Sequence, residues 1–439
     1  MSVYSRLRKQ FARFEAQVFS CSTELTKEDL EAWLEYDFKE ASQNKVRKRS
    51  TGAGFELPAH PGPRVLLDYQ QEIVQAAYEL IQARDNCIIA LPTGAGKTTT
   101  AVHLLFQALS EGHSRIAWLA PQRLLAEQAF AEFSHAWWSV KQLRSVNLCL
   151  TDKILASVLE EGHTVAFDTL QKWLNSSRWV FNPEIVIIDE CHHIEANEFG
   201  RLVDRLQKAG AVVIGLTATP GRRMDIEGGG LRSRFGGNLI VPRLLGEEPV
   251  KTLQTRQVYS QLRHHHIKPT YSSDRELVQL KKGVVAPSLA SLSPGRLDAI
   301  VNYARAKSCA KQGIIFAYSI AHCHVIAAAL HRVGIGVSVI DGRSPDIVNQ
   351  NRIRGFMRGD VQYLVNVRYL AVGADLPTTD LVLLSVPVGS PILFEQIVGR
   401  VCRGPLVGGS ESAVIADFDD HLKRFGAPRS YARFKSDWL

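Results

Sequence analysis

Hydrophobic positions along this chain follow two periods, and each period predicts a different element. From residue 66 onward, short apolar runs alternate with stretches whose apolar residues recur every three or four positions. The runs are typical of buried strands and the longer stretches of amphipathic helices. Strand candidates lie at 86–91, 115–119, 164–167, 184–188 and 211–215, and again at 313–317, 337–340, 362–366, 381–386 and 413–416. Because alternating strands and helices form parallel sheets, the fold class is α/β with two tandem parallel-sheet domains.

The region before these domains reads as helical. One helical repeat consists of Tyr4, Leu7, Phe11, Phe14 and Val18, and a second consists of Leu30, Trp33, Leu34 and Phe38, with Thr26 and Asp29 placed to cap it. A basic stretch with glycine and proline at 44–64 reads as a linker. Since the repeats give an apolar face, we expect an accessory unit that packs on the first domain or docks a protein partner.

Breaks in the pattern set the domain boundaries. The helical accessory region and its linker occupy 1–63, and the first α/β domain occupies 64–235. From Gly221 to Pro294 the strand and helix pattern gives way to glycines, basic residues and polar loops, so 236–295 is an interdomain linker or insertion. The second α/β domain follows at 296–439.

Composition narrows the class of partner. The chain has 439 residues and a pI of about 9.1, and Lys plus Arg exceed Asp plus Glu by 52 − 44 = 8. A basic balance favours a polyanionic partner. The seven cysteines are scattered and form no C-x-x-C pair, which argues against a disulfide framework or a zinc ribbon and predicts reduced core or near-site thiols. With no signal peptide and no long apolar run, we expect a cytoplasmic protein without a membrane partner.

A phosphate-binding loop follows the first strand candidate. The sequence from Ala90 to Thr98 places glycines, a lysine and a threonine between a strand and a helix, with Leu91 where the strict pattern has glycine. Main-chain N–H groups in such a turn meet phosphate oxygens, the lysine adds a point charge and the threonine hydroxyl binds Mg²⁺. The nucleotide-binding residues predicted here are Pro92, Thr93, Gly94, Ala95, Gly96, Lys97, Thr98 and Thr99. A tight glycine turn without a ligand would not require Lys97 and Thr98.

An acidic pair ends the fourth strand candidate. Asp189 and Glu190 follow the apolar run 186–188, where a parallel sheet presents ligands at its carboxyl edge. Asp189 is positioned to hold Mg²⁺, together with Thr98, and Glu190 to polarise an attacking water as general base. A solvated strand end is the alternative, but it is improbable so soon after a phosphate loop.

Several ordered motifs resemble those of superfamily 2 helicases and translocases over residues 64–420. In the first half, Leu67-Asp68-Tyr69-Gln70 resembles the adenine-reading Q-type motif, with Leu67 where Arg is usual, and residues 120–128 are similar to the Ia motif, which contacts one strand. The DECH box at 189–192 and the TAT segment at 215–220 follow. In the second half, residues 314–319 are similar to motif IV, residues 364–377 are similar to motif V, and residues 396–403 match the Q-x-x-G-R-x-x-R motif VI in full.

The resemblance implies two RecA-like domains, ATP and Mg²⁺ as cofactors, and specific roles for residues. It implies nucleotide contacts by Tyr69, Gln70, Gly373 and Asp375, catalytic roles for Lys97, Asp189, Glu190, Gln396, Arg400 and Arg403, and nucleic-acid contacts by Gln122, Arg123, Thr169, Thr217, Thr219, Tyr318, Val367 and Arg368. Two arginines three apart on a helix share a face, and their guanidinium forks suit a terminal phosphate. Arg400 and Arg403 are therefore the expected arginine fingers, although a phosphate-backbone contact would use the same chemistry.

The motifs are similar to those of RadD-type repair helicases and of the type III restriction translocase branch, which mostly act on DNA. DECH and TAT are less typical of RNA-specific DEAD-box proteins, so DNA is favoured over RNA. The predicted function is an ATP-dependent DNA helicase or duplex translocase in repair, recombination or defence. An RNA helicase and an ATP-gated nucleic-acid sensor or recruiter that separates no strands are the alternatives.

Four further features have plainer interpretations. The tract 264–266 of three histidines could bind a metal, but a solvated loop is favoured. Trp137 and Trp138 could stack on bases, but a core position is favoured. His322-Cys323-His324 is expected to begin a packed helix. The basic residues at 45–49 could grip phosphates or belong to a linker.

Overall fold

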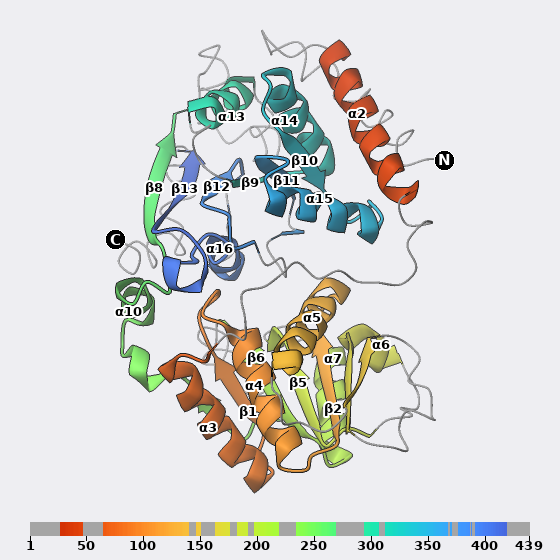
Figure 1. Ribbon diagram of the computed structural model, residues 1–439, viewed down its shortest axis with the longest axis vertical. Helices are drawn as coiled ribbons and strands as arrows, with labels where there is room; N and C mark the ends of the chain where they lie inside the picture. The colour runs from red at the N-terminus through yellow and green to blue at the C-terminus, as the bar shows by residue number, and fades with distance from the viewer. Residues whose placement is uncertain are drawn as a thin grey trace. The chain divides into compact units, whose positions relative to one another are not determined.

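The chain forms two α/β units in a computed structural model (Figure 1). The structure describes residues 27–46, 65–139, 146–150, 163–175, 182–191, 197–218, 234–268, 294–306, 312–367, 369–370, 376–386, 388 and 391–418. The first unit spans Leu57–Leu253, and the second combines Met1–Glu56 with Gln254–Leu439. None of the helices in the described ranges combines the length and the hydropathy that a membrane span requires.

The first unit is built on a seven-stranded sheet. Its order is β3-β4-β2-β5-β6-β1-β7, and every neighbouring pair is parallel. The strands are β1 (Cys87–Ala90), β2 (Arg115–Ala120), β3 (Val146–Leu150), β4 (His163–Thr169), β5 (Ile185–Ile188), β6 (Val212–Thr217) and β7 (Leu239–Ile240). The helices are α3 (Asp68–Ala83), α4 (Lys97–Ser110), α5 (Arg123–Ser139), α6 (Leu170–Asn175), α7 (Asn197–Lys208) and α10 (Pro249–Thr255), with a 3-10 turn, η4 (Arg243–Leu245).

The second unit is built on a six-stranded parallel sheet. Its order is β10-β11-β9-β12-β13-β8. The strands are β8 (Gln261–Ile267), β9 (Gly313–Phe316), β10 (Val337–Ile340), β11 (Tyr363–Asn366), β12 (Leu381–Leu384) and β13 (Ser412–Phe418). The helices are α2 (Lys27–Val46), α13 (Pro294–Ala306), α14 (Ile320–Arg332), α15 (Asp346–Arg358) and α16 (Pro391–Val398), with a 3-10 turn, η5 (Pro405–Val407). The predicted α/β class with two parallel-sheet domains is confirmed.

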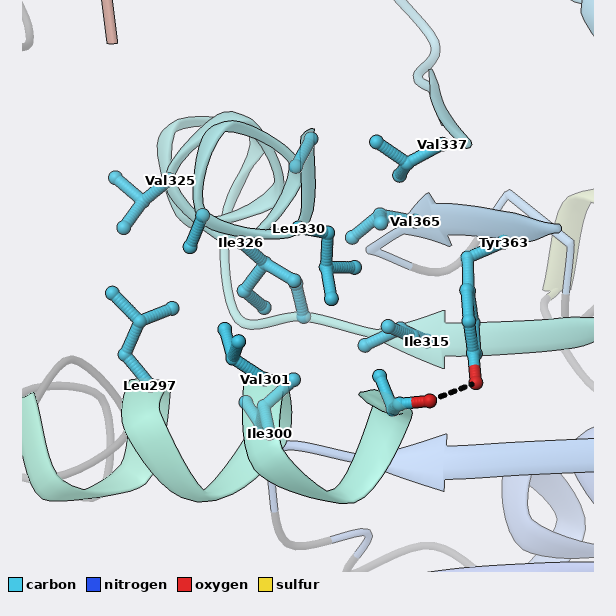
Figure 2. Close-up of a cluster of buried hydrophobic side chains, with 14 of the residues drawn as sticks. Leu297, Ile300, Val301, Ile315, Val325, Ile326, Leu330, Val337, Tyr363 and Val365 are labelled. Carbon is cyan, nitrogen blue, oxygen red and sulfur yellow. Dashed lines mark hydrogen bonds between the residues drawn. The ribbon is translucent and has the colours of Figure 1, made fainter. Parts of the chain in front are cut away.

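Apolar strands and helix faces form a core in each unit. In the second unit, Leu297, Ile300 and Val301 of α13 pack with side chains of α14 and of the strands (Figure 2). The hydroxyl of Tyr363 donates to the carbonyl of Ala304 at 3.4 Å and joins β11 to α13. Strands buried on both faces read as continuous apolar runs, which is why the sequence pattern located most of them.

The segment 236–295 is not only a linker. Residues 239–240 form β7 at one edge of the first sheet, and residues 261–267 form β8 at one edge of the second. Both are edge strands: β7 has only two residues, and β8 has polar residues at most of its positions, so neither gives a long apolar run. The histidine tract 264–266 therefore lies in a strand rather than in the expected loop.

The N-terminal helix α2 packs on the second unit, which corrects the expectation that it packs on the first domain. It contacts α14 and α15, as the red helix in Figure 1 shows. Leu30, Trp33 and Leu34 join the core of the second unit. The indole N–H of Trp33 donates to Nδ1 of His324 at 3.2 Å. The apolar face of α2 is thus covered by other helices of this chain. The repeat at residues 4–18 and the capping residue Thr26 lie outside the described residues.

Charged side chains fix α2 in this position. Asp37 pairs with Arg352, whose side chain is only 1% exposed, and Asp29 lies 3.6 Å from Arg332. Asp29, Trp33 and Asp37 are four residues apart, so they share one face of α2. The distance of these partners along the chain explains why no local pattern predicted the docking.

Candidate functional site

The predicted phosphate loop joins β1 to α4. Gly94 and Gly96 have φ of +91° and +86°, a left-handed backbone that favours glycine. A Cβ on Gly96 would lie 2.3 Å from Nε2 of Gln70, so any larger residue would displace this amide in addition to straining the backbone. The N–H of Leu91 donates to the carbonyl of Thr217 at 3.1 Å and ties the start of the loop to β6. The strand, loop and helix context that the motif requires is therefore present.

The segment 67–70, which resembles the Q-type motif, binds the backbone of the phosphate loop. The hydroxyl of Tyr69 and the amide of Gln70 both donate to the carbonyl of Ala95, at 2.9 and 3.1 Å. Both side chains are buried, and Oε1 of Gln70 also accepts from the N–H of Leu67. The sequence predicted adenine contacts for this pair and missed the bonds to the loop, which fix the backbone around Gly96.

The acidic pair lies at the carboxyl edge of the first sheet. The N–H of Asp189 donates to the carbonyl of Leu119, and Oδ1 of Asp189 accepts from the N–H of Glu190, each at 2.9 Å. Glu190 has φ of +47°, uncommon for a residue with a side chain. Nζ of Lys97 lies 3.3 Å from Oε1 of Glu190, and both side chains are 10% exposed. The fold thus brings Lys97, Asp189 and Glu190 together, with Thr98 half-buried in the first turn of α4.

Cys191 connects the acidic pair to β6. A Cβ on Gly215 would lie 2.8 Å from Sγ of Cys191, so strand and loop are in closest contact there. Burial, and then the charge of Glu190, raises the pKa of the Cys191 thiol well above its usual range. The thiol is therefore protonated and acts as a packing group. Cys87, Cys323 and Cys402 are likewise buried free thiols, as the sequence predicted for the cysteines.

Thr99 does not direct its hydroxyl at the phosphate loop. Its Oγ1 donates to Oε1 of Glu132 on α5 at 2.8 Å. On the same pair of helices, Phe106, Phe133 and Trp137 form an aromatic cluster, in which Trp137 stacks on Phe133. Trp137 is thus half-buried and packs on the edge of this cluster rather than within the buried core, and the side chain of Trp138 lies outside the described residues.

The predicted nucleic-acid residues of the first unit lie near the carboxyl edge of its sheet. Gln122 and Arg123 are exposed at the start of α5, and Arg123 pairs with Glu127 at 2.8 Å. Thr169 ends β4 and Thr217 ends β6. Thr217 is only 1% exposed, so its clearest described connection is the carbonyl bond to the phosphate loop. Thr219 lies outside the described residues.

Motif VI has a different local structure from the one expected. α16 ends at Val398, so Arg400 and Arg403 lie beyond the helix and do not share a helical face. Arg403 instead pairs with Tyr259 in an isolated antiparallel bridge, and its carbonyl accepts from the hydroxyl of Ser260 at 2.6 Å. Gly399 follows the last helical residue, and glycine has low helix propensity. Gln396 lies within α16 and is 5% exposed.

Motifs IV and V meet around the carboxyl end of β9. The amide of Asn366 donates to the carbonyl of Ile315 at 3.3 Å, and Val367 packs against the core of the second unit. Tyr318 is 50% exposed two residues beyond β9. Arg368, Gly373 and Asp375 lie outside the described residues.

The two histidine tracts lie in β8 and in α14. Nδ1 of His265 and the hydroxyl of Tyr303 share a 2.6 Å hydrogen bond, and burial raises the pKa of Tyr303 to about 12. His322 and His324 are buried in the first turns of α14, as predicted for a packed helix. In the described part of the chain, no group of three or more His, Cys, Asp or Glu side chains could hold a metal ion.

A phosphate loop and an acidic pair at the edge of a parallel sheet, followed by a second α/β unit, define a P-loop ATPase with two motor units. Residues 64–222 match the family described as "Type III restriction enzyme, res subunit", and residues 295–404 match "Helicase conserved C-terminal domain". The chain belongs to the superfamily 2 helicases and translocases, and it carries both halves of their ATPase motor.

Individual relatives are distant. A Saccharomyces cerevisiae protein that carries the name ATP-dependent helicase IRC3 is 22% identical over 358 residues, which are 77% of this chain and 49% of that protein. The chain spans about half the length of the curated relatives it matches. A point variant of S. cerevisiae Dbp5 bound to RNA and ADP BeF3 is similar in structure, with a TM-score of 0.56, 16% identity and coverage of 83% of this chain and 91% of that one.

A second solved structure is the ATP-dependent Type ISP restriction-modification enzyme LlaBIII bound to DNA. It has a TM-score of 0.58 and 15% identity, and the match covers 83% of this chain and 28% of that one. At these identities the two structures show the fold, which is that of tandem RecA-like domains.

Proposed function

We propose that this superfamily 2 ATPase is a DNA motor, a helicase or duplex translocase that acts in repair, recombination or defence. The observation that carries the proposal is the arrangement of Lys97 and Glu190 beside the glycine turn at Gly96. Phosphoryl transfer to water requires a backbone turn that binds the phosphates, a lysine that neutralises their charge and a carboxylate that accepts a proton from water. The cytoplasm, favoured by the sequence, is the proposed compartment.

The residues present fit a bound nucleotide. The backbone around Gly96 has a left-handed φ and is fixed by hydrogen bonds from Tyr69 and Gln70, so its N–H groups are held in place for phosphate oxygens. ATP supplies a terminal phosphoryl group whose transfer to water releases free energy. We assign the phosphate contacts to Lys97 and to main-chain N–H groups of residues 92–99.

Mg²⁺ is part of the proposal. The Thr98 hydroxyl and the Asp189 carboxylate lie on the two segments that meet at the carboxyl edge, and oxygen ligands are those that Mg²⁺ prefers. Glu190 then orients water and accepts its proton. From the second unit, Gln396, Arg400 and Arg403, with Gly373 and Asp375, are proposed to act on the nucleotide held by the first.

Nucleic acid is proposed to contact Gln122, Arg123, Thr169, Thr217, Thr219, Tyr318, Val367 and Arg368. Most of these side chains are suited to phosphate or sugar, so we expect salt-sensitive binding with little sequence preference. The basic pI of about 9.1 supports a polyanionic partner.

DNA is favoured over RNA for two reasons. The chain has a DECH box and a TAT segment, and its first unit matches a restriction enzyme subunit family. An RNA helicase remains the second candidate, because the structure of Dbp5 bound to RNA has a similar fold. A sensor whose ATPase resets binding without strand separation is the third.

The test is ATP turnover by the full chain in the presence of single-stranded DNA, duplex DNA, forked DNA or RNA. A DNA motor is stimulated by at least one DNA form and more weakly by RNA of the same sequence. Strand displacement or movement past a bound roadblock then separates a motor from a sensor. Stimulation by RNA alone overturns the DNA assignment.

A further inference from the structure

Tyr318 is an exposed aromatic side chain at a distinctive place in the second sheet. It lies just beyond β9, which has β11 and β12 as neighbours. The chain runs from β9 through α14 to β10 on one side, and the later strands β12 and β13 lie on the other. The strand order therefore reverses at β9, and parallel sheets bind ligands outside the carboxyl ends of the strands at such a point.

The end of β9 is fixed from both sides. The N–H of Ala317 donates to the carbonyl of Asn366 at 2.7 Å. The carbonyl of Phe316 accepts from the N–H of Ser385 at 3.1 Å and from its hydroxyl at 2.7 Å. Because these bonds come from the strands on either side, the backbone that carries Tyr318 has little freedom.

His322 fixes the next turn of chain. Its Nδ1 accepts from the N–H of Tyr318 at 3.2 Å, and its own N–H donates to the hydroxyl of Ser319, also at 3.2 Å. Burial, and then the charge of Arg296, lowers the pKa of His322 to about 3. The ring is therefore neutral, and Nδ1 keeps the lone pair that the Tyr318 N–H needs.

The ring of Tyr318 is half exposed although its backbone is held at three neighbouring positions. Binding costs free energy when both a side chain and its backbone must be ordered, and a backbone that is already fixed removes the second part of that cost. The proposed ligand of the motor is nucleic acid, and nucleobases have flat faces on which an aromatic ring stacks without sequence preference.

Resting on the proposed nucleic-acid function, we propose that Tyr318 is a stacking platform for one nucleobase of a bound single strand, with His322 as its positioning residue. The contact is with the base and not with the phosphate. It is thus chemically distinct from the phosphate contacts expected of Gln122 and Arg123.

The first measurement is the affinity of the full chain for a fluorescein-labelled oligothymidine strand, by anisotropy at two salt concentrations. Tyr318→Ala is expected to weaken binding by about 5- to 150-fold, the equivalent of about 1–3 kcal/mol for one stacked base. Tyr318→Phe retains the ring and the affinity. The salt dependence is the same in all variants, because no charge changes. Tyr36→Ala, at another exposed tyrosine of the second unit, is the matched control and leaves affinity unchanged.

The base contact itself is tested with a strand that has abasic sites. If Tyr318 stacks on a base, Tyr318→Ala weakens binding of the abasic strand far less than it weakens binding of oligothymidine. An equal loss on both strands overturns the proposal in favour of a sugar or phosphate contact. Loss of affinity for fluorescent ADP in place of the strand overturns it in favour of adenine.

The role of His322 is tested with two substitutions that differ in whether they keep a hydrogen-bond acceptor. His322→Asn places an oxygen near the position of Nδ1 and retains the affinity for oligothymidine, whereas His322→Leu, of similar bulk but without an acceptor, reproduces much of the Tyr318→Ala loss. Wild-type affinity in a folded His322→Leu protein overturns the positioning role. A wild-type chain that binds no strand overturns the proposed nucleic-acid function as well, while strand binding unaffected by Tyr318→Ala overturns this inference alone.

Discussion

At the scale of single residues, Lys97 and Glu190, the pair to which we assign ATP hydrolysis, are held in a constrained form. Glu190 combines a left-handed backbone with an ion pair to Lys97, and both side chains are largely buried. Such strain persists only where surrounding contacts impose it. The carboxylate is therefore engaged by the same lysine that is proposed to bind phosphate, so nucleotide competes with Glu190 for Lys97.

Replacing Glu190 by Gln separates binding from hydrolysis. Glu190→Gln removes the general base, so turnover is expected to fall by about 100-fold or more. Because Lys97 then faces a neutral group, nucleotide affinity stays equal or rises. Steady-state hydrolysis and a titration with fluorescent nucleotide measure the two effects. Lys97→Ala is the comparison, since it weakens binding itself. Turnover of Glu190→Gln within a few-fold of wild type would remove Glu190 from the chemistry.

Gly96 and Gly112 form a natural control pair. Both have positive φ, +86° and +103°, but a Cβ on Gly112 meets nothing within 4 Å. Gly96→Ala is expected to weaken nucleotide binding, because the methyl group displaces the Gln70 amide from the carbonyl of Ala95. Gly112→Ala carries only the backbone strain and destabilises by about 1 kcal/mol or somewhat more. Nucleotide titration measures the affinity of both variants, and thermal unfolding measures their stability. Equal nucleotide affinity in the two variants would show that the contact with Gln70 is unimportant.

At the scale of elements, the N-terminal helix α2 completes the second unit. Trp33 is fully buried, and Asp37 neutralises Arg352 in a nearly buried pair. Loss of one partner of such a pair leaves an uncompensated charge. Asp37→Ala is therefore expected to destabilise the second unit by about 3–5 kcal/mol. Truncation of the chain at Pro61 removes this helix as well.

Thermal unfolding of Asp37→Ala measures that cost. Glu35→Ala, an exposed position on the same helix, is the control and leaves the melting temperature nearly unchanged. Fluorescent nucleotide binding by the first unit is the second readout and is expected to survive. An unchanged melting temperature in Asp37→Ala would mean that α2 adds little to the fold.

The two buried histidines of α14 predict a pH dependence. Burial lowers the pKa of both His322 and His324, that of His322 to about 3, so the folded chain binds fewer protons than the unfolded chain. The stability that the two neutral rings contribute is complete above the unfolded pKa of about 6.5 and decreases as pH falls below it, and the contribution of His322 is lost as pH falls through about 3. Melting temperatures between these limits should fall less steeply in His322→Asn. Parallel curves for variant and wild type would contradict this.

Sequence reasoning succeeded where chemistry is local. Lys97, Asp189 and Glu190 each lie within a few residues of a buried strand, so short motifs located them. It failed where the partner is distant: Trp33 meets His324 across 291 positions, and the Tyr69 and Gln70 bonds to the phosphate loop depend on the fold. It also failed at Arg403, where a glycine and a β-bridge end the helix that its spacing implied.

At the scale of the whole molecule, motor action requires that the second unit respond to the nucleotide bound by the first. Arg400→Ala and Arg403→Ala are expected to lose nucleic-acid-stimulated turnover while ATP affinity falls less. Stimulated turnover, ATP affinity and strand affinity are measured together. Normal hydrolysis with loss of strand binding alone would place these arginines on the nucleic acid.

The docking of α2 also sets an order of events during synthesis. The helix leaves the ribosome first, but its partner His324 follows 291 residues later, after the entire first unit. At about 5–20 residues per second this delay is about 15 to 60 s. Throughout that time Trp33 has no α14 to pack against, and all the strands of the first sheet are made before α14 is complete. Nascent chains stalled before residue 320 should therefore expose Trp33 to a chaperone or a protease, and chains stalled well beyond the second sheet should not.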